Sequence, residues 1–246
     1  MSDRTILRIS GPDARDFLQG LVSNDVRKLE QGLVYAAILT PQGKYRADFF
    51  LVPDGDTILM DIASSLAPGI KQTLTMYKLR SAVEIEETDI TVTRGLGTPP
   101  EGAFADPRSD AMGWRAYNGH AGDADVDWDA VRVAAGVPES DIELTPESYI
   151  LEMGFERLNG VDFKKGCFVG QEVVARMKHK TVLRKGLAQV AVEGEAPVGT
   201  DISVGEKPAG TLFTQAGGKA LAYLRYDRAT DDMQAGGAIV RYQPDS

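Results

Sequence analysis

The residues best suited to chemistry lie in one stretch, Lys164 to Arg176, which reads KKGCFVGQEVVAR and holds the single cysteine of the chain, Cys167. Gly166 and Gly170 lie on either side of Cys167, and glycine permits positive φ angles and a close backbone approach. We therefore expect the thiol on an open turn. A lone cysteine is more often a small buried apolar residue, but these glycines and the charged neighbours, such as Lys165, favour a reactive thiol.

A helix is predicted directly after this turn, because apolar side chains recur at helical spacing from about Gly170. These apolar residues are Val173, Val174 and Met177. Cys167 then lies just before a helix N-terminus, where free N–H groups, the helix dipole and the neighbouring lysines favour the thiolate, the nucleophilic and metal-binding form. Glu172 and Arg176 lie four residues apart and can form an ion pair, which leaves the amide of Gln171 to point at the turn.

Length and composition indicate a globular protein of one large or two to three small domains, since 43% of the 246 residues are hydrophobic. The longest apolar run, Leu33 to Leu39, is far shorter than the roughly 20 residues of a membrane helix. The first residues, MSDRTILRIS, do not resemble a signal peptide. We therefore expect a cytoplasmic protein without a membrane anchor. One cysteine and two histidines exclude an internal disulfide, a zinc site and a cluster held by one chain.

The net charge of −9 argues against general or direct binding of nucleic acid. The stretch from Lys164 to Lys185 reverses this sign, with seven basic residues and one acidic residue. A basic patch on an acidic protein suits an anionic small ligand or an acidic protein partner. The alternative is a solvated basic face without a ligand.

The first hundred residues alternate between strand and helix patterns, which indicates an α+β unit with a helix packed on a sheet. Strands are expected at residues 4–9, 33–39, 45–52, 57–62, 83–86 and 90–93, and helices at residues 14–25 and 66–77. The turn from Thr40 to Lys44 contains proline and glycine and predicts a hairpin. Residues 95–102, GLGTPPEG, have the composition of a linker. Aspartates at alternate positions from Asp123 to Asp129 are expected to be solvated and to cap a helix that carries Trp128.

After Lys185 the pattern changes to short β-rich runs that glycines interrupt. These runs cover residues 187–192, 201–204, 209–213, 220–226 and 238–242. Five short strands at this spacing predict a small antiparallel barrel or sandwich at the C-terminal end.

The stretch around Cys167 resembles the signature of the YgfZ family of folate-binding proteins, relatives of the glycine-cleavage T-protein (aminomethyltransferase, GcvT-like). That signature is matched by Lys165, Gly166, Cys167, Phe168, Gly170, Gln171, Glu172 and Arg176. Further similar segments are FLQG at 17–20, SND at 23–25, LTPQGK at 39–44, YKLR at 77–80 and LNGV at 158–161. Phe168 replaces the tyrosine that is commoner in the family.

The resemblance implies an α+β fold of three subdomains in a ring, with tetrahydrofolate at the centre and a C-terminal antiparallel β-barrel. It implies a discontinuous folate-binding domain at residues 1–50 and 98–183, an inserted α+β domain at 51–97 and the barrel at 184–246. The implied folate-binding residues are Asn24, Asp25, Glu152, Gly166, Gly170, Gln171, Glu172 and Arg176. Glu152 corresponds to the segment in which T-protein relatives carry a pterin-binding glutamate.

The resemblance implies a factor that assists assembly or repair of iron–sulfur clusters in client enzymes, including tRNA-modifying enzymes. Cys167 and Lys165 would then act on a sulfur, iron or one-carbon species. The alternative is a folate-dependent aminomethyl- or methyltransferase. T-protein relatives carry a pair of aspartates after the turn, which match Ala47 and Asp48 in this sequence, and in that case Asp48 would orient or deprotonate the folate amine. Asp48 could equally be an outward-facing strand residue.

Overall fold

The structure is a computed structural model that describes residues 3–117, 119–180, 182–230 and 232–243. Contacts divide the chain into two compact units. Unit 1 comprises Met1–Val126 and Phe155–Ala175, and unit 2 comprises Asp127–Gly154 and Arg176–Ser246. The helix that follows the cysteine crosses the boundary between them. Within the described ranges, no helix combines the length and the apolar character needed to cross a membrane.

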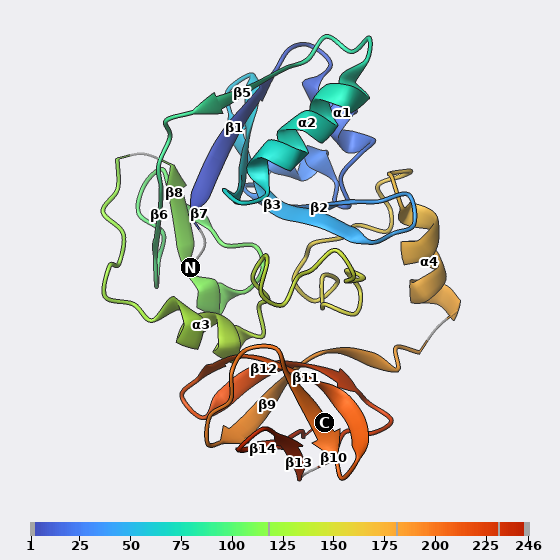
Figure 1. Cartoon of the computed structure of the whole chain (residues 1–246). Coiled ribbons are helices and arrows are strands. Elements are labelled where there is room, and N and C mark those ends of the chain that lie inside the picture. Colours follow the sequence, from blue (N-terminus) through green and yellow to red (C-terminus); the bar gives the residue numbers. More distant parts are fainter. Residues whose placement is uncertain (1–2, 118, 181, 231, 244–246) are drawn as a thin grey trace. The chain divides into compact units, whose positions relative to one another are not determined.

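An antiparallel sheet in the described part of unit 1 has five strands in the order β2-β3-β4-β1-β5. Figure 1 labels β1, β2, β3 and β5. They are β1 (Arg4–Ser10), β2 (Val34–Leu39), β3 (Tyr45–Asp54), β4 (Thr57–Ala63) and β5 (Glu84–Thr88). β2 and β3 form the predicted hairpin, with Val34 opposite Leu51 and Leu39 opposite Tyr45. Its turn closes where the Gly43 N–H donates to the Thr40 carbonyl at 2.8 Å.

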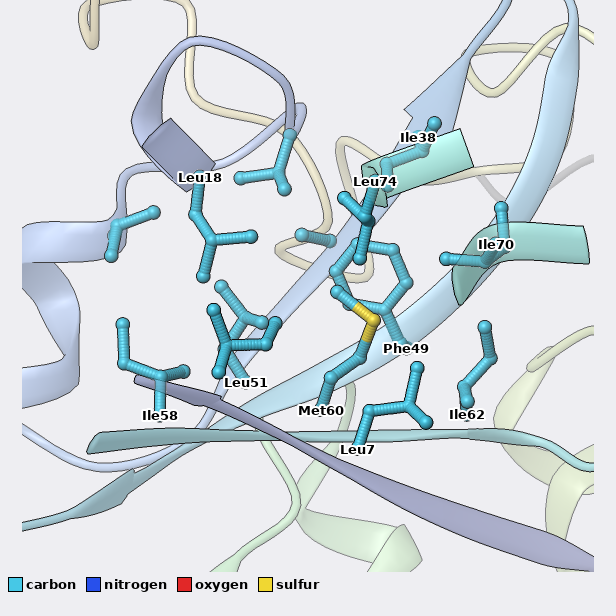
Figure 2. Packing of buried hydrophobic residues seen from close by; sticks show 14 of the residues in the cluster. Leu7, Leu18, Ile38, Phe49, Leu51, Ile58, Met60, Ile62, Ile70 and Leu74 are labelled. Atoms are coloured by element: carbon cyan, nitrogen blue, oxygen red, sulfur yellow. The ribbon is translucent and has the colours of Figure 1, made fainter. Parts of the chain in front are cut away.

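Two helices, α1 (Ala14–Gln19) and α2 (Ala67–Lys78), and the 3-10 helix η1 (Val26–Glu30) pack on one face of this sheet. Figure 2 shows Leu18 of α1 and Leu74 of α2 pointing into the same cluster as Phe49 and Met60 of the sheet. All four side chains are fully buried. A fully buried leucine contributes about 2 kcal/mol, so this cluster fixes α1 and the segment after it on the sheet.

The opposite face of the sheet carries buried charge. Asp61 on β4 accepts hydrogen bonds from Arg4 at 2.5 Å and from Arg115 at 2.8 Å. Arg115 comes from a small sheet of order β6-β8-β7. The described strands of that sheet are β6 (Val92–Gly95), β7 (Phe104–Ala105) and β8 (Trp114–Tyr117), with η2 (Asp110–Met112) between β7 and β8. These ion pairs lower the pKa of Asp61 against the opposing effect of its burial. Paired charge on one face and apolar packing on the other explain why β2, β3 and β4 are buried on both sides.

Unit 2 contains α3 (Trp128–Ala135) and a closed barrel (Figure 1, orange to red). The side chain of Asp127 caps α3 by accepting from the Ala130 N–H at 3.0 Å, as the sequence predicts. The barrel strands that the structure describes are β9 (Lys185–Glu193), β10 (Thr200–Val204), β11 (Lys207–Ala216), β12 (Lys219–Arg225), β13 (Met233–Ala235) and β14 (Ala238–Arg241). The buried triad of Arg132, Glu143 and Thr214 ties α3 to β11, because Glu143 accepts from both of the others.

The predicted fold class, α+β with a C-terminal antiparallel barrel, is confirmed. The division into units differs from the predicted domains, in which residues 51–97 form a separate inserted domain. β4 and β5 come from that range and pair with β1 and β3, because the hydrogen-bonded sheet continues past residue 50. Of residues 95–102, Gly95 is the last residue of β6 and pairs with Trp114, and the others connect β6 to β7 within unit 1.

Candidate functional site

The cysteine lies on a loop of unit 1, residues 162–170, that we call the signature loop. Lys165 and Phe168 are buried in this loop, whereas Gly166 and Cys167 between them are exposed. The Lys165 ammonium group donates to the Gln19 carbonyl and, at 2.7 Å, to the Val22 carbonyl. It also lies 5.0 Å from the centre of the Phe168 ring. The two buried side chains therefore anchor the loop and leave the thiol at its surface.

Two glycines let the signature loop pack closely against the hairpin turn of β2 and β3. Gly170 has a φ of +82°, and a Cβ added there would lie 2.6 Å from the Thr40 carbonyl oxygen. A Cβ added to Gly43 would lie 2.7 Å from Cβ of Val173. Only glycine at both positions allows this approach. The turn motif LTPQGK and the cysteine motif are therefore neighbours in space.

The predicted helix after the cysteine is present as α4 (Gln171–Lys180). Gln171 is its first residue, and Glu172 and Arg176 are exposed on it. Cys167 precedes the helix by four residues, as predicted. The lysine that was expected to stabilise the thiolate points elsewhere: the described residues show no hydrogen bond between Lys165 and the thiol, and the ammonium faces the end of α1. The described residues also contain no group of three or more His, Cys, Asp or Glu side chains placed to hold a metal ion.

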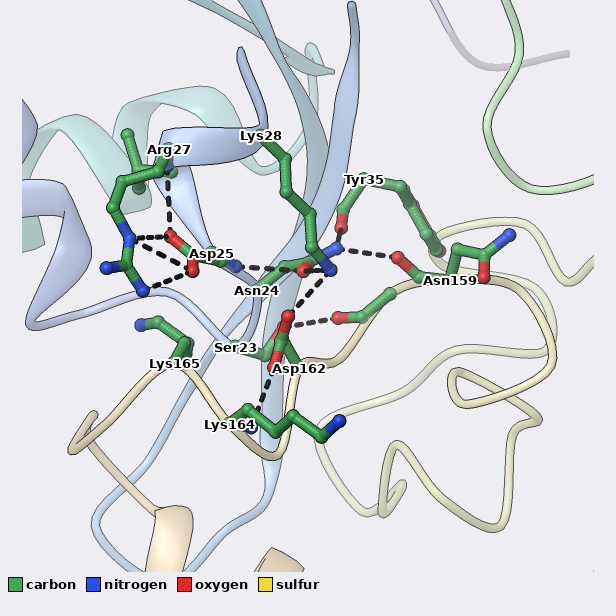
Figure 3. A network of polar contacts seen from close by, with 12 residues as sticks. Ser23, Asn24, Asp25, Arg27, Lys28, Tyr35, Asn159, Asp162, Lys164 and Lys165 are labelled. Atoms are coloured by element: carbon green, nitrogen blue, oxygen red, sulfur yellow. Dashed lines mark hydrogen bonds and ion pairs between the residues drawn. The ribbon is translucent and has the colours of Figure 1, made fainter. Parts of the chain in front are cut away.

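A partly buried polar network joins residues 159–162, which lead into the signature loop, to the segment after α1 (Figure 3). Asn24 is 3% exposed. Its amide group donates to the carbonyls of Tyr35 at 2.8 Å and Asn159 at 2.6 Å. Its side-chain oxygen accepts from the Asp25 N–H at 2.8 Å and from the Lys28 ammonium at 3.0 Å. Asn24 thus uses both donors and its acceptor within the protein, so its observed role is to hold two distant segments together.

Ser23 and Asp162 extend the same network. The Ser23 hydroxyl donates to the Gly160 carbonyl at 2.6 Å and accepts from the Ala37 N–H at 2.9 Å. The Ser23 carbonyl accepts from the Asp162 N–H at 3.0 Å, and the Asp162 carboxylate pairs with Lys28 at 2.8 Å. These contacts fix the backbone at the start of the signature loop.

Asp25 and Lys165 lie close to each other and have shifted pKa values. Hydrogen bonds from Arg27 hold the pKa of Asp25 at about 2. Burial lowers the pKa of the Lys165 ammonium to about 8, although Asp25 and Asp162 oppose this shift. Figure 3 shows the Lys165 side chain directed toward the pair of Asp25 and Arg27. Asp25 was predicted to contact folate; its observed partners are Arg27 and Gln19.

Glu152 belongs to unit 2 and lies next to the barrel. It is 8% exposed, and one carboxylate oxygen accepts from the Tyr223 hydroxyl at 2.5 Å. The same oxygen lies 3.9 Å from the Lys185 ammonium. Burial and the neighbouring carboxylate raise the pKa of Tyr223, so its hydroxyl stays a donor at neutral pH. The carboxylate of Glu152 is thus fixed in position by one neutral donor and has acceptor capacity left.

Asp48 is 5% exposed, so the alternative of an outward-facing strand residue is wrong. Its two oxygens accept from the hydroxyls of Tyr35 at 2.9 Å and Tyr45 at 2.6 Å. Burial and Asp48 raise the pKa of Tyr35 well above its ordinary value. Asp48 is thus held by two buried tyrosine hydroxyls, and these contacts support a role in packing.

Sequence reasoning missed three residues that complete these arrangements. Gln19 donates to Asp25 and to the Lys165 carbonyl, and it accepts from the Val26 N–H. Arg27 fixes Asp25, and Tyr223 fixes Glu152. Only Gln19 had a signal in the sequence, since it belongs to the FLQG segment of the family resemblance.

Comparison with known proteins identifies the family. A family model described as the CAF17 C-terminal beta-barrel domain matches residues 184–246. A mouse protein named iron-sulfur cluster assembly factor IBA57, mitochondrial, is 31% identical over 260 residues, which cover 89% of this chain and 72% of the mouse protein. The chain belongs to the IBA57 family.

Other relatives agree with this placement. An IBA57 homologue from Mycosarcoma maydis, named as a mitochondrial iron-sulfur cluster assembly factor, is 33% identical over 222 residues. The match covers 76% of this chain, which spans 55% of that protein's length. The crystal structure of the glycine cleavage system aminomethyltransferase T from Bartonella henselae has a TM-score of 0.76 at 13% identity, covering 99% of this chain and 84% of that chain. A likeness at 13% identity concerns the fold alone. The IBA57-family chain therefore shares the aminomethyltransferase fold.

The predicted cytoplasmic location is contradicted by these relatives, because the mouse and Mycosarcoma maydis IBA57 proteins are both named as mitochondrial. The cytoplasmic prediction depends on two sequence criteria, a signal peptide and a membrane helix. Neither criterion separates one aqueous compartment from another. The narrower resemblance to YgfZ stays a prediction within the IBA57 family.

Proposed function

We propose that this protein assists the assembly of iron–sulfur clusters in client proteins, with Cys167 as the group that contacts the cluster or its components as cargo. The observation that carries the proposal is the placement of the thiol. Cys167 is exposed on a loop that the buried side chains of Lys165 and Phe168 anchor. The IBA57 relatives are named as iron–sulfur cluster assembly factors, which supports the same role. Because one thiol cannot complete the ligand set of a cluster, a partner or client must supply the other ligands.

The test uses cells that lack their own IBA57-family protein and measures the activity of a [4Fe–4S] enzyme. We expect the intact chain to restore this activity and Cys167→Ser, which is close to isosteric, to fail. Because Cys167 is exposed, the variant should have the same urea unfolding midpoint as the intact protein. The control is Gln42→Ala, an exposed change on the neighbouring hairpin turn, which should restore activity fully. Full restoration by Cys167→Ser would remove the thiol from the mechanism.

We also propose tetrahydrofolate as a ligand, with Glu152 as an acceptor for N–H groups of the pterin ring. A carboxylate can accept two such bonds side by side. The position of Glu152 supports this role, because Tyr223 bonds only one of its oxygens and holds it in place. The same family resemblance suggests tRNA-modifying enzymes among the clients. Reduced folate would act as a ligand that orders the site.

Isothermal titration with tetrahydrofolate tests this ligand independently of cluster assembly. Glu152→Gln keeps an acceptor for the Tyr223 hydroxyl but removes the charge and one acceptor position. We expect this variant to bind about tenfold more weakly, in keeping with the loss of a charge-assisted pair of hydrogen bonds. Tyr223→Phe should weaken binding less, because the carboxylate stays charged. Absence of binding by the intact protein would exclude the folate proposal and leave the cluster proposal standing.

The alternative, an aminomethyltransferase centred on Asp48, has less support. Such an enzyme needs a carboxylate that reaches the folate amine. Asp48 is buried and accepts from two tyrosine hydroxyls instead. One-carbon transfer through folate also gives no role to an exposed Cys167.

A further inference from the structure

A pocket of about 270 Å³ lies in unit 1 beside the anchor of the signature loop. Its lining residues are Arg15, Asp16, Gln19, Val26, Arg27 and Lys165. Three segments far apart in the sequence meet there: α1, the start of η1 and the signature loop. The thiol of Cys167 and the carboxylate of Glu152 are not part of this lining, so the pocket is a separate feature from the groups of the proposed function.

Three of the lining side chains are cationic and keep donors available. An ammonium group has three N–H donors, and Lys165 uses two of them for the carbonyls of Gln19 and Val22. Arg27 bonds Asp25 through Nε and Nη2, while its Nη1 makes no hydrogen bond to the part of the chain that the structure describes. Arg15 is exposed and has no hydrogen bond or ion pair with any described residue. Three residues of the lining therefore have donors that no described residue uses.

The remaining lining groups do not cancel the cationic character of the pocket. Gln19 has no donor to spare, because its amide nitrogen bonds Asp25 and the Lys165 carbonyl. Asp25 neutralises part of the charge of Arg27, but it also holds the guanidinium in place with Nη2 at 2.6 Å from its carboxylate. A fixed guanidinium edge loses less conformational freedom when it binds an anion than a mobile one. Asp16 is the one acidic side chain in the lining, and it is exposed on α1 next to Arg15.

We propose that this pocket binds a small oxyanion, the carboxylate or phosphate group of a small-molecule ligand. Arg15 and Arg27 present planar guanidinium groups, which match the geometry of such oxygens, and the third N–H of Lys165 completes the set of donors. Because Lys165 also anchors the signature loop, an occupied pocket is directly connected to the segment that carries Cys167. The pocket volume suits an anionic group of a few heavy atoms and leaves room for a linked portion of a larger ligand.

The experiment uses the full chain labelled with ¹⁵N and titrates inorganic phosphate at constant ionic strength and neutral pH. We expect saturable shifts, with a dissociation constant in the millimolar range, for the backbone amides of Gln19, Val26 and Arg27. Arg15→Gln should weaken binding about three- to tenfold, as expected for the loss of one partly exposed charged donor. The absence of saturable shifts at these amides in the intact protein would overturn the proposal.

Two matched variants make the test specific. Arg46→Gln removes the same charge from an exposed position on β3 outside the lining, and it should leave the dissociation constant unchanged. Asp16→Asn removes the acidic group of the lining and should tighten phosphate binding, because an unfavourable charge is lost. If Arg15→Gln and Arg46→Gln weaken binding equally, phosphate responds only to net charge and the proposal fails. Weaker phosphate binding by Asp16→Asn would contradict it as well, because loss of a negative charge from the lining should favour an anion.

The source of the oxyanion is distinguished by two further titrations. L-glutamate tests a free carboxylate, and tetrahydrofolate with one or with several glutamates tests a folate tail. Competition of phosphate with the polyglutamate form alone assigns the pocket to that tail. Competition with L-glutamate, or phosphate binding without any effect on folate, assigns it to a separate small ligand. Both outcomes support an oxyanion pocket, and neither depends on whether folate binds at Glu152.

Discussion

Replacement of Asn24 by alanine should destabilise unit 1 strongly, because this one side chain bonds two segments that lie 135 residues apart. The change removes three hydrogen bonds, those to the carbonyls of Tyr35 and Asn159 and that from the N–H of Asp25. Each lost bond of this kind costs about 1 kcal/mol. Loss of the hydrogen bond from Lys28 should add little to this free-energy cost, because the exposed lysine keeps its ion pair with Asp162. The expected loss in the free energy of unfolding is therefore about 3 kcal/mol.

Urea unfolding followed by tryptophan fluorescence can assign this loss to one unit. The chain has two tryptophans, Trp114 in unit 1 and Trp128 in unit 2. In a Trp128→Phe background, Trp114 reports on unit 1 alone. With a urea dependence of about 2 kcal/mol per molar for a unit of this size, Asn24→Ala should lower the midpoint by about 1.5 M.

Two controls make this prediction open to refutation. Gln42→Ala removes an exposed amide and should change the free energy of unfolding by no more than about 0.5 kcal/mol. Asn24→Asp keeps the size of the side chain but loses the donors to both carbonyls, so it should be at least as destabilising as Asn24→Ala. A loss below about 1 kcal/mol for Asn24→Ala, or a midpoint equal to that of Gln42→Ala, would show that the network does not hold the two segments together.

Three further predictions follow from the contacts of unit 1. Asp48→Asn should lower its free energy of unfolding by about 1–3 kcal/mol in urea titrations, because the amide NH₂ cannot accept from a tyrosine hydroxyl; an unchanged midpoint would contradict a packing role. Gly170→Ala should lower the free energy of unfolding clearly more than Gly55→Ala. Both glycines have positive φ, but only at Gly170 does the new methyl group meet a backbone carbonyl, at 2.6 Å. Equal urea midpoints for the two variants would refute the close approach. Lys165 has a folded-state pKa of about 8, below its ordinary value of 10.5. Between these pH values the unfolded chain binds more protons, so the stability of the intact protein relative to Lys165→Met should rise as the pH increases through this window; parallel pH profiles would argue against the lowered pKa.

Local signals in the sequence predicted much of the fold. The β2–β3 hairpin follows from proline and glycine in its turn, and α4 begins next to the predicted position because apolar spacing and Gly170 mark its start. The cap at Asp127 depends on a bond to a residue three positions away. Each of these features is decided by neighbours within a few residues. β13, at Met233–Ala235, escaped detection because a strand of three residues has no measurable periodicity.

The partners of the candidate site residues could not be predicted in this way, because they come from distant parts of the chain. Lys165 was expected to act on the nearby thiol, but its ammonium bonds carbonyls at the end of α1. Asp48 looked like either a catalytic or a solvent-facing group, and tyrosines of β2 and β3 enclose it. The number of strands in the sheet could not be predicted for the same reason. Nothing in residues 51–97 alone indicates that β4 and β5 complete the sheet started by β1.

The bond from Lys165 to Gln19 joins residues that are 146 positions apart in the sequence, which determines when the thiol can reach its final position during synthesis. At 5–20 residues per second, a ribosome needs roughly 7–30 s after Gln19 to add Lys165. Until then the end of α1 lacks this hydrogen-bonding partner. Closing so long a loop also costs conformational entropy, which slows the formation of the contact. The cysteine is therefore among the last parts of unit 1 to be fixed in a nascent chain. A chain released before residue 165 would carry the β1–β5 sheet without the segment that bears the thiol.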